Sequence, residues 1–286
     1  MIIRKTITII LLLNLFLNAD YKQTITWDIP IEPPITYIKN NEYLGYGISI
    51  MKSIQSFMPE YNHQIRVAGN YKRLSLNVKE GPLTCALGLF KTEERLKYMH
   101  FTQVPVFSFF DLQIVLSMDT FNKLGKPKVL SLEKLLHEKG FKLGVSHGRT
   151  YSKKVRDILD ENKDNLNIKT YAQSNVTNSL LKMLVRARFD YMFLYPDEAM
   201  YYSKDFKISK KIVTVPILEN KDYGYSWLSC TKNDKGKIAV SKISDILLTI
   251  RKENKYMNFY IDNISSNLHE YYKNNFQDNF LKIFEE

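Results

Sequence analysis

The stretch GLFKTEERLKYMHFT, residues 88–102, begins with apolar residues typical of the end of a buried strand. It then changes abruptly to the polar run Lys91, Thr92, Glu93, Glu94 and Arg95. A solvated loop between a strand and a helix would explain this change. A loop that holds a ligand would explain it equally well, because binding residues are concentrated on loops at the ends of core strands. Patterns elsewhere in the sequence are needed to choose between the two interpretations.

Strand-like and helix-like segments alternate along most of the chain. Strands are predicted at residues 23–29, 63–69, 83–90, 141–146, 166–172 and 190–195, and helices at 48–58, 71–81, 150–165 and 176–189. The run at 83–90 is continuously apolar, as expected of a strand that is covered on both faces. Residues from 237 onward are almost wholly helical in pattern. The alternation predicts an α/β protein with two alternating units and parallel sheets.

The N-terminus has the pattern of a secretory signal peptide. Arg4 and Lys5 precede an uncharged apolar run, and Ala19 offers a small residue for cleavage. The run is too short to span a bilayer comfortably. An N-terminal membrane anchor is the alternative. We therefore expect residues 1–19 to be removed and the protein to be periplasmic.

The charge of the chain is strongly positive. Its 286 residues include 41 Lys and Arg against 30 Asp and Glu, and the formal charge of +11 becomes +9 when Arg4 and Lys5 are lost with the signal peptide. The lysines are scattered, and no arginine-rich stripe or nucleic-acid motif occurs. We interpret the excess lysine as a solvated surface and expect no nucleic-acid partner.

The histidine and cysteine patterns argue against a metal site. None of the five histidines is spaced as a zinc pair, and no carboxylate-rich calcium loop occurs, so we expect no metal and no cofactor. Cys85 and Cys230 are the two cysteines, and in an oxidising compartment they favour a disulfide; two separately buried thiols are the alternative, since cysteine also packs as a small apolar residue.

Residues 88–102 and three further stretches of the chain all resemble segments of one known protein family. The three further stretches are EPPITYIKNNEYLGYGISIMKSI (32–54), KLGVSHGRTYSKKV (142–155) and RARFDYMFLYPDEAMYY (186–202). Together the four stretches resemble, in order, the type II extracellular solute-binding proteins of family 3, which deliver amino acids and similar solutes to ABC importers. The resemblance implies a periplasmic-binding-protein-like fold with two lobes. Each lobe would hold a mostly parallel sheet flanked by helices, and two crossing strands would join the lobes.

The resemblance also implies how the chain is divided. The first lobe would contain residues 20–112 and 224–286, and the second lobe would be inserted as residues 113–223. In this fold the strand that returns from the second lobe lies antiparallel beside the strand that precedes Thr92. That arrangement would join Cys85 to Cys230, with Cα atoms about 4.4–6.8 Å apart.

In the resembled family, the arginine that matches Arg95 forms a two-pronged ion pair with a ligand carboxylate, a task that suits a guanidinium. Thr92 would add a hydroxyl donor. In the second lobe His147, Arg149 and Thr150 match the loop that opens a ligand-facing helix, whose N-terminus favours an anion. The alternative is that Arg95 simply pairs with a glutamate beside it.

Two departures from the family concern the ligand. Gly88 and Phe90 stand where the amino-acid binders keep small hydroxyl residues. Tyr195 stands where they keep an acid for the ligand ammonium, and the nearest acids are Asp197 and Glu198. A standard amino acid is therefore not the expected ligand.

Four cations near the expected site, Arg73, Lys91, Arg95 and Arg149, suggest a small polar, acidic ligand instead. On the first loop, Glu32 could accept a hydrogen bond and Trp27 could form a wall of the cleft. For Trp27 a core position is an equal alternative, since an aromatic residue on a strand usually packs.

Two enzyme classes compete with a binding protein. GVSHG (144–148) matches the G-x-S-x-G elbow of serine hydrolases, with Ser146 as the nucleophile and His269 as the only later histidine. A binding-protein fold adapted to a dehydratase, with Glu93 or Glu198 as the general acid, is the other, because fold does not fix function. A dry carboxylate with a raised pKa and no cationic partner would favour it.

The sequence is best interpreted as a monomeric periplasmic solute-binding protein without enzymatic activity. We expect it to close on a small-molecule ligand and to act with an ABC importer permease or a membrane sensor.

Overall fold

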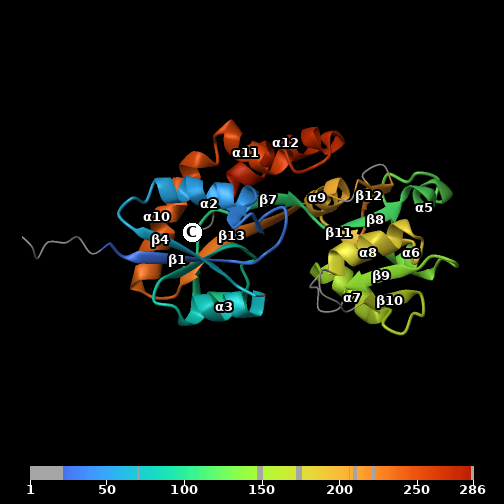
Figure 1. Ribbon diagram of the computed structural model, residues 1–286, viewed down its shortest axis with the longest axis horizontal. Helices are drawn as coiled ribbons and strands as arrows, with labels where there is room; N and C mark the ends of the chain where they lie inside the picture. The colour runs from blue at the N-terminus through green and yellow to red at the C-terminus, as the bar shows by residue number, and fades with distance from the viewer. Residues whose placement is uncertain are drawn as a thin grey trace, which may run out of the picture.

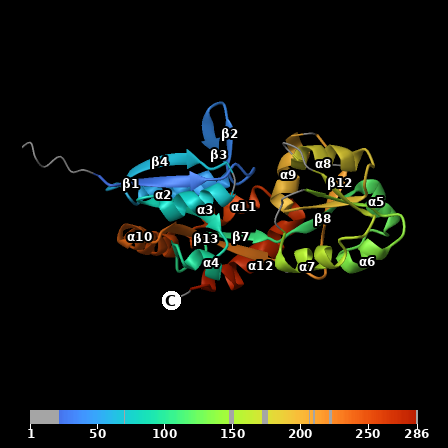
Figure 2. The same ribbon diagram turned by 90° about the horizontal axis from the view of Figure 1, so that it is seen from below.

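The computed structural model describes residues 22–69, 71–146, 151–171, 176–205, 207–208, 211–220 and 223–284. The predicted signal peptide, residues 1–19, lies outside them. The described chain forms two lobes that lie side by side, each a β-sheet with helices packed on it (Figures 1 and 2).

The sheet of the first lobe takes strands from both ends of the chain. Its order is β4-β1-β5-β13-β6, and β7 pairs with a further part of β13. The strands are β1 (Thr24–Ile29), β4 (Asn62–Val67), β5 (Thr84–Leu89), β6 (Met99–Phe101), β7 (Phe107–Phe110) and β13 (Tyr223–Thr231). β1 runs parallel to β4 and β5, whereas β13 runs antiparallel to β5, β6 and β7.

The second lobe contains strands from the middle of the chain only. Its sheet has the order β10-β9-β11-β8-β12, and β8 runs antiparallel to β11 and β12. The strands are β8 (Gln113–Ser117), β9 (Leu143–Ser146), β10 (Ile168–Tyr171), β11 (Tyr191–Leu194) and β12 (Ile212–Pro216). The predicted α/β fold with mostly parallel sheets is confirmed, and in each sheet one strand, β13 or β8, runs against the others.

Helices cover both faces of each sheet, as the continuously apolar pattern of β5 predicts. In the first lobe α2 (Tyr46–Ser56), α10 (Asp234–Ile250) and α11 (Asn254–Ile261) share one core with Cys85 and Leu87, and α3 (Tyr71–Glu80) shares the opposite core with Ala86 and Leu89. In the second lobe α6 (Leu132–His137) and α7 (Lys153–Glu161) cover one face, and α8 (Val176–Val185) and α9 (Pro196–Asp205) cover the other. The remaining elements are the hairpin β2 (Tyr37–Lys39) and β3 (Glu42–Leu44), α4 (Glu93–Leu96), α5 (Met118–Lys123), α12 (His269–Asp278) and the short helices Ser266–Leu268 and Phe280–Lys282.

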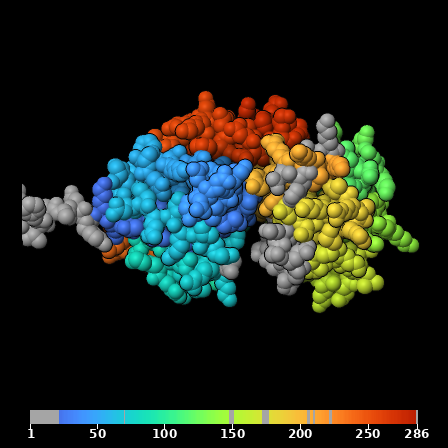
Figure 3. Space-filling view, viewed as in Figure 1, coloured from blue at the N-terminus to red at the C-terminus, as the bar shows by residue number. Residues whose placement is uncertain are grey.

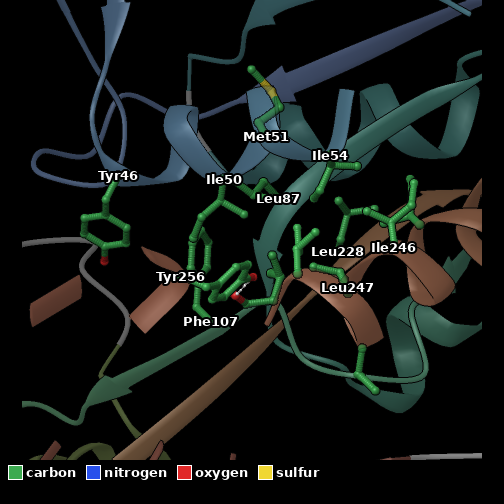
Figure 4. Close-up of a cluster of buried hydrophobic side chains, with 14 of the residues drawn as sticks. Tyr46, Ile50, Met51, Ile54, Leu87, Phe107, Leu228, Ile246, Leu247 and Tyr256 are labelled. Atoms are coloured by element: carbon green, nitrogen blue, oxygen red, sulfur yellow. Dashed lines mark hydrogen bonds between the residues drawn. The ribbon is translucent and has the colours of Figure 1, made fainter. Parts of the chain in front are cut away.

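The larger core of the first lobe ends at the boundary between the lobes. Within this core Ile50, Met51 and Ile54 of α2 pack with Leu228 of β13 and with α10, and Tyr46 lies at the edge of the cluster (Figure 4). Tyr46 therefore has its ring anchored in the first lobe and its hydroxyl near the second.

The chain passes between the lobes twice, from β7 to β8 and from β12 to β13. The C-terminal helices α11 and α12 lie above this region in Figure 1. Tyr272 of α12 donates from its hydroxyl to the carbonyl oxygen of Ser108 in β7 at 3.0 Å, and Tyr225 of β13 donates to Asn275 at 3.0 Å. The residue boundaries predicted for the lobes, 112/113 and 223/224, stay predictions.

Cys85 and Cys230 form a disulfide, as the resemblance predicted. They are direct partners on the antiparallel strands β5 and β13. Their Cα atoms are 4.0 Å apart, closer than the expected range. The closer approach fits their cross-strand pairing, since directly opposite residues of antiparallel strands reach about 4.5 Å.

Candidate ligand-binding site

A pocket lies where the two lobes meet, and it encloses about 780 Å³ of empty space including its open mouth. The space-filling view shows the surface hollowed into a notch between the lobes (Figure 3). The first lobe contributes Pro30, Glu32, Pro33, Ile35, Thr36, Tyr46, Tyr71, Leu87, Gly88, Phe90, Phe107, Phe109 and Ser226 to the lining; the second contributes Tyr195, Asp197 and Glu198.

The loop after β1 forms one side of the pocket and also closes the start of α2. The backbone N–H groups of Ile35 and Thr36 donate to the carbonyl oxygen of Glu32 at 2.9 and 3.0 Å, which makes a tight turn. The N–H groups of Tyr46 and Gly47 donate to the carbonyls of Pro34 and Ile35 at 3.2 and 2.9 Å. These two N–H groups at the N-terminus of α2 are therefore engaged by the chain itself and are not donors for an anion.

Gly88 and Phe107 form the floor of the pocket. Gly88 has φ +77°, in the left-handed region that favours glycine, and a Cβ atom there would lie 2.9 Å from the Phe107 ring. The sequence departure at this position, glycine in place of a small hydroxyl residue, lets an aromatic ring lie directly on the strand end.

Strand β7 supplies the aromatic wall through its alternation. Successive side chains of a strand point to opposite faces, so Phe107 and Phe109 line the pocket while Phe110 packs against Tyr272 of α12. The centroid of the Phe109 ring lies 5.8 Å from that of Tyr195 of the second lobe, in an edge-on arrangement, and 6.2 Å from that of Phe90. Aromatic residues from both lobes thus meet around the pocket.

The second lobe presents two acids in the first turn of α9, Asp197 and Glu198. Asp197 is 3% exposed, and its carboxylate accepts a hydrogen bond from the Tyr46 hydroxyl of the first lobe at 3.0 Å. Burial raises the pKa of Asp197 from 3.8 to about 7; the Tyr46 hydrogen bond lowers the pKa, and the charge of Glu198 raises it. Because this carboxyl is buried, charging it is costly.

The two other acids of the lining have further hydrogen-bonding neighbours. Glu198 accepts from the Thr177 hydroxyl at 3.3 Å and from the Tyr195 backbone N–H at 3.5 Å. Glu32 accepts from the Tyr71 hydroxyl. In the described part of the chain, the lining contains three carboxylic acids and no lysine or arginine.

The structure places the residues of the predicted anion site beside this pocket, outside the described lining. Thr92 caps α4, since its hydroxyl accepts from the backbone N–H of Arg95 at 3.3 Å. The Arg95 guanidinium donates to the carbonyl oxygen of Phe90 at 2.8 Å, so it supports the backbone of a lining residue. Arg73 and Lys91 do not line the pocket either.

Trp27 is not a wall of the cleft. It is 1% exposed, belongs to the core of the first lobe, and donates from Nε1 to Nδ1 of His63 at 3.0 Å. Its position inside β1, between β4 and β5, explains the burial. The core alternative for Trp27 is correct.

The predicted second-lobe residues His147, Arg149 and Thr150 lie outside the described residues. The hydrolase alternative gains no support from the parts that are described. His269 is hydrogen-bonded through Nε2 to the carbonyl oxygen of Ile264 at 3.2 Å, and no described hydrogen bond joins it to Ser146. Ser146 ends β9 in the second lobe, whereas His269 begins α12 on the first.

Of the residues that the sequence interpretation assigned to ligand binding, Glu32, Tyr195, Asp197 and Glu198 line the pocket, and their role in binding stays a prediction. It missed Tyr46, Tyr71, Phe107, Phe109 and Ser226. The motif FSFF at 107–110 carried a signal, because aromatic residues at alternate positions of a strand that crosses between lobes can share one face.

Neither a metal site nor a membrane-spanning segment is found in the described chain. No group of three or more His, Cys, Asp or Glu side chains there could hold a metal ion. The helices present in the same ranges are all too short or too polar to cross a bilayer.

Comparison with known proteins gives matches at the level of structure only. No family model matches the chain, and no curated protein matches it in sequence. The "probable amino-acid ABC transporter extracellular-binding protein" YtmK of Bacillus subtilis is similar with a TM-score of 0.64 and 19% identity, over 86% of this chain and 99% of that one. A histidine kinase sensor domain with similarity to periplasmic binding proteins has a TM-score of 0.61 and 16% identity, over 93% and 99%.

A third similar structure is an ancestral amino-acid-binding protein described as a precursor of cyclohexadienyl dehydratase. Its TM-score is 0.61 at 18% identity, and the match covers 85% of this chain and 96% of that one. At these identities the likeness establishes the fold. The chain has the fold of the periplasmic binding proteins, as the sequence resemblance implied.

Proposed function

We propose that the protein is a periplasmic solute-binding protein that captures one small molecule between its two lobes. The observation that carries this proposal is the pocket at the lobe boundary, which takes its lining from both lobes. Ligand pockets are typically concave, largely apolar and supplied with a few well-placed polar groups, often at domain interfaces. This pocket has aromatic walls and a buried carboxyl, so it fits that description.

Contacts across the boundary support capture by closure. The Tyr46 hydroxyl reaches Asp197, and the rings of Tyr37 in the β2–β3 hairpin and Tyr201 in α9 lie 5.4 Å apart. Closure of two lobes about a hinge is a common mode of ligand capture. Structural neighbours named as ABC transporter binding proteins and as a kinase sensor domain support an importer or a sensor as the partner.

The experiment is mass spectrometry of small molecules released by denaturing gently purified protein, followed by calorimetry with each compound found. One compound per chain that binds again to the emptied protein would support solute capture. Absence of any released compound, together with no binding in a broad solute library, would contradict it.

An acidic ligand, which the sequence suggested, depends on Arg95 and on residues 147–150. The described lining does not support it, because it brings three carboxyl groups to the pocket. Arg95 would have to leave the Phe90 carbonyl to meet a ligand.

A proton-transfer enzyme such as a dehydratase is the second candidate, and one observation favours it. Asp197 is buried, its pKa is raised to about 7, and among the described residues no cation is hydrogen-bonded to it. A general acid or base works best with a pKa near the operating pH. Catalysis would be established if the protein converted the released compound and Asp197→Asn did not. If the compound stayed unchanged after long incubation, catalysis would be excluded.

A further inference from the structure

Asp197 is a buried carboxyl to which no described cation is hydrogen-bonded. Within the described residues the one side chain hydrogen-bonded to it is the neutral Tyr46 hydroxyl at 3.0 Å, and the backbone N–H groups of Asp197 and Glu198 also donate to its carboxyl. It lines the pocket with only 3% of its surface exposed. A buried carboxylate normally has a cationic partner, because an isolated charge is expensive to bury. Among the described residues, no cation is hydrogen-bonded to Asp197.

The walls beside Asp197 are aromatic. Tyr46 contacts Phe107 edge-on with ring centroids 5.6 Å apart, and Phe109 contacts Tyr195 in the same manner at 5.8 Å. The faces of aromatic rings attract cations, and recognition of amines and quaternary ammonium groups by several rings is a well-known use of that attraction. The acid and the rings therefore favour the same kind of ligand.

Other occupants fit these observations less well. An anion would meet the buried Asp197 carboxyl, and two like charges close together are unfavourable where little water screens them. A metal ion would need several ligands converging on one point, and the described acids do not form such a group.

We propose that the pocket binds a small organic cation, an amine or a quaternary ammonium compound, with its charge against Asp197 and its apolar part against Phe107 and Phe109. This inference rests on the proposed solute-binding function and specifies the ligand class. It differs from the zwitterionic amino acid and from the acidic ligand considered above, since it requires no carboxylate on the ligand.

The experiment uses two matched sets of probes with calorimetry on the emptied full-length protein. One set is choline, its neutral isostere dimethylbutanol and the carboxylate dimethylbutanoate. The other is phenylethylammonium, phenylethanol and phenylpropanoate. We expect the cation of at least one set to bind at least about tenfold more tightly than both its neutral and its anionic counterpart, as a charge pair in a dry site implies.

Two variants assign the preference to Asp197. Asp197→Asn keeps an oxygen that can accept from Tyr46 but removes the charge, so the cation should lose its advantage over the neutral isostere. Asp234→Asn is the matched control, because Asp234 is an exposed acid in the first turn of α10, outside the pocket, and its replacement should leave the preference intact.

The pH dependence gives an independent readout. Asp197 faces Tyr46 of α2, Tyr260 of α11 and Tyr272 of α12, with Glu198 beside it on α9, and burial raises the pKa of each of these tyrosines well above its ordinary value. A carboxyl with a pKa of about 7 is mostly ionised at pH 8 and mostly protonated at pH 6. The affinity of the wild type for the cation should fall about tenfold when the pH is lowered from 8 to 6, and the affinity of Asp197→Asn should stay the same.

The outcomes separate the inference from the proposed function. Equal or tighter binding of the neutral or anionic probes, or a released natural ligand that is not a cation, would overturn the cation inference and leave solute binding standing. If no probe, library compound or released compound binds, solute binding itself is overturned and the cation inference with it.

Discussion

Removal of the charge from Asp197 should make the protein more stable, by an amount that depends on pH. The side chain is 3% exposed, and its pKa in the folded protein is about 7 against an ordinary value of 3.8. A difference of about three pH units corresponds to about 4 kcal/mol of free energy, at about 1.4 kcal/mol for each unit. An uncharged Asn at this position should avoid that cost.

The direction of this pH dependence follows from the different pKa values of Asp197 in the folded and the unfolded protein. The folded protein keeps the Asp197 proton up to about pH 7, whereas the unfolded chain releases it near pH 4. The free energy of unfolding of the wild type therefore falls as the pH rises between these values. The cost of this carboxyl is about 2 kcal/mol at pH 5 and about 4 kcal/mol at pH 8, so the advantage of Asp197→Asn should grow by about 2–3 kcal/mol across this range.

Urea unfolding of the wild type, Asp197→Asn and the exposed control Asp234→Asn at pH 5 and pH 8 measures this difference. Comparison between variants at one pH cancels the titration of all other groups. The control should track the wild type at both pH values. An advantage of Asp197→Asn that is the same at pH 5 and pH 8, or a loss of stability at pH 8, would show that Asp197 does not carry an unpaired buried charge.

Three other outcomes are expected. Cys85→Ser with Cys230→Ser should lower the free energy of unfolding by about 3–5 kcal/mol, because the disulfide closes a loop of 145 residues, and thiol counting on the unfolded, unreduced wild type should find none free. Gly88→Ala should weaken ligand binding and lower the melting temperature, since a Cβ there would lie 2.9 Å from Phe107 at φ +77°; unchanged calorimetry and melting would contradict the close approach. Arg95→Ala should change ligand affinity by less than about 1 kcal/mol, whereas a loss of about 2–5 kcal/mol would identify Arg95 as an anion anchor.

The fold was predictable because its signals are local. In each lobe strands alternate with helices, and apolar residues recur at different intervals along the two kinds of element. The uninterrupted apolar run of β5 indicates that helices cover both faces of its sheet. The direction of β13 was implied only by the family resemblance, and the direction of β8 was not predicted. Both strands continue from a crossing between the lobes, and a crossing strand enters its sheet in a direction that no residue pattern records.

The site was predictable only in part, because its lining depends on how the two lobes meet. The acids of α9 stood out in the sequence because Tyr195 replaces the family's acid, and both Asp197 and Glu198 proved to be buried. Arg95 was assigned to the ligand by resemblance, yet its guanidinium is bonded to the Phe90 carbonyl. Tyr46 gave no sequence signal, since its role depends on a partner 151 residues away in the chain.

Strand β7 connects the pocket to the C-terminal helices through its alternation. Phe107 and Phe109 line the pocket. The alternate residues Ser108 and Phe110 are hydrogen-bonded through their backbone to the C-terminal helices: the Ser108 carbonyl accepts from the Tyr272 hydroxyl, and the Phe110 N–H donates to the Tyr260 hydroxyl, each at 3.0 Å. A rotation of β7 that moved the aromatic wall would therefore also have to change these buried hydrogen bonds, which are costly to leave unmade. The same strand leads directly into the crossing to β8. The packing of α11 and α12 and the relative position of the lobes are thus linked through β7, as they are through β13 by its Tyr225–Asn275 hydrogen bond.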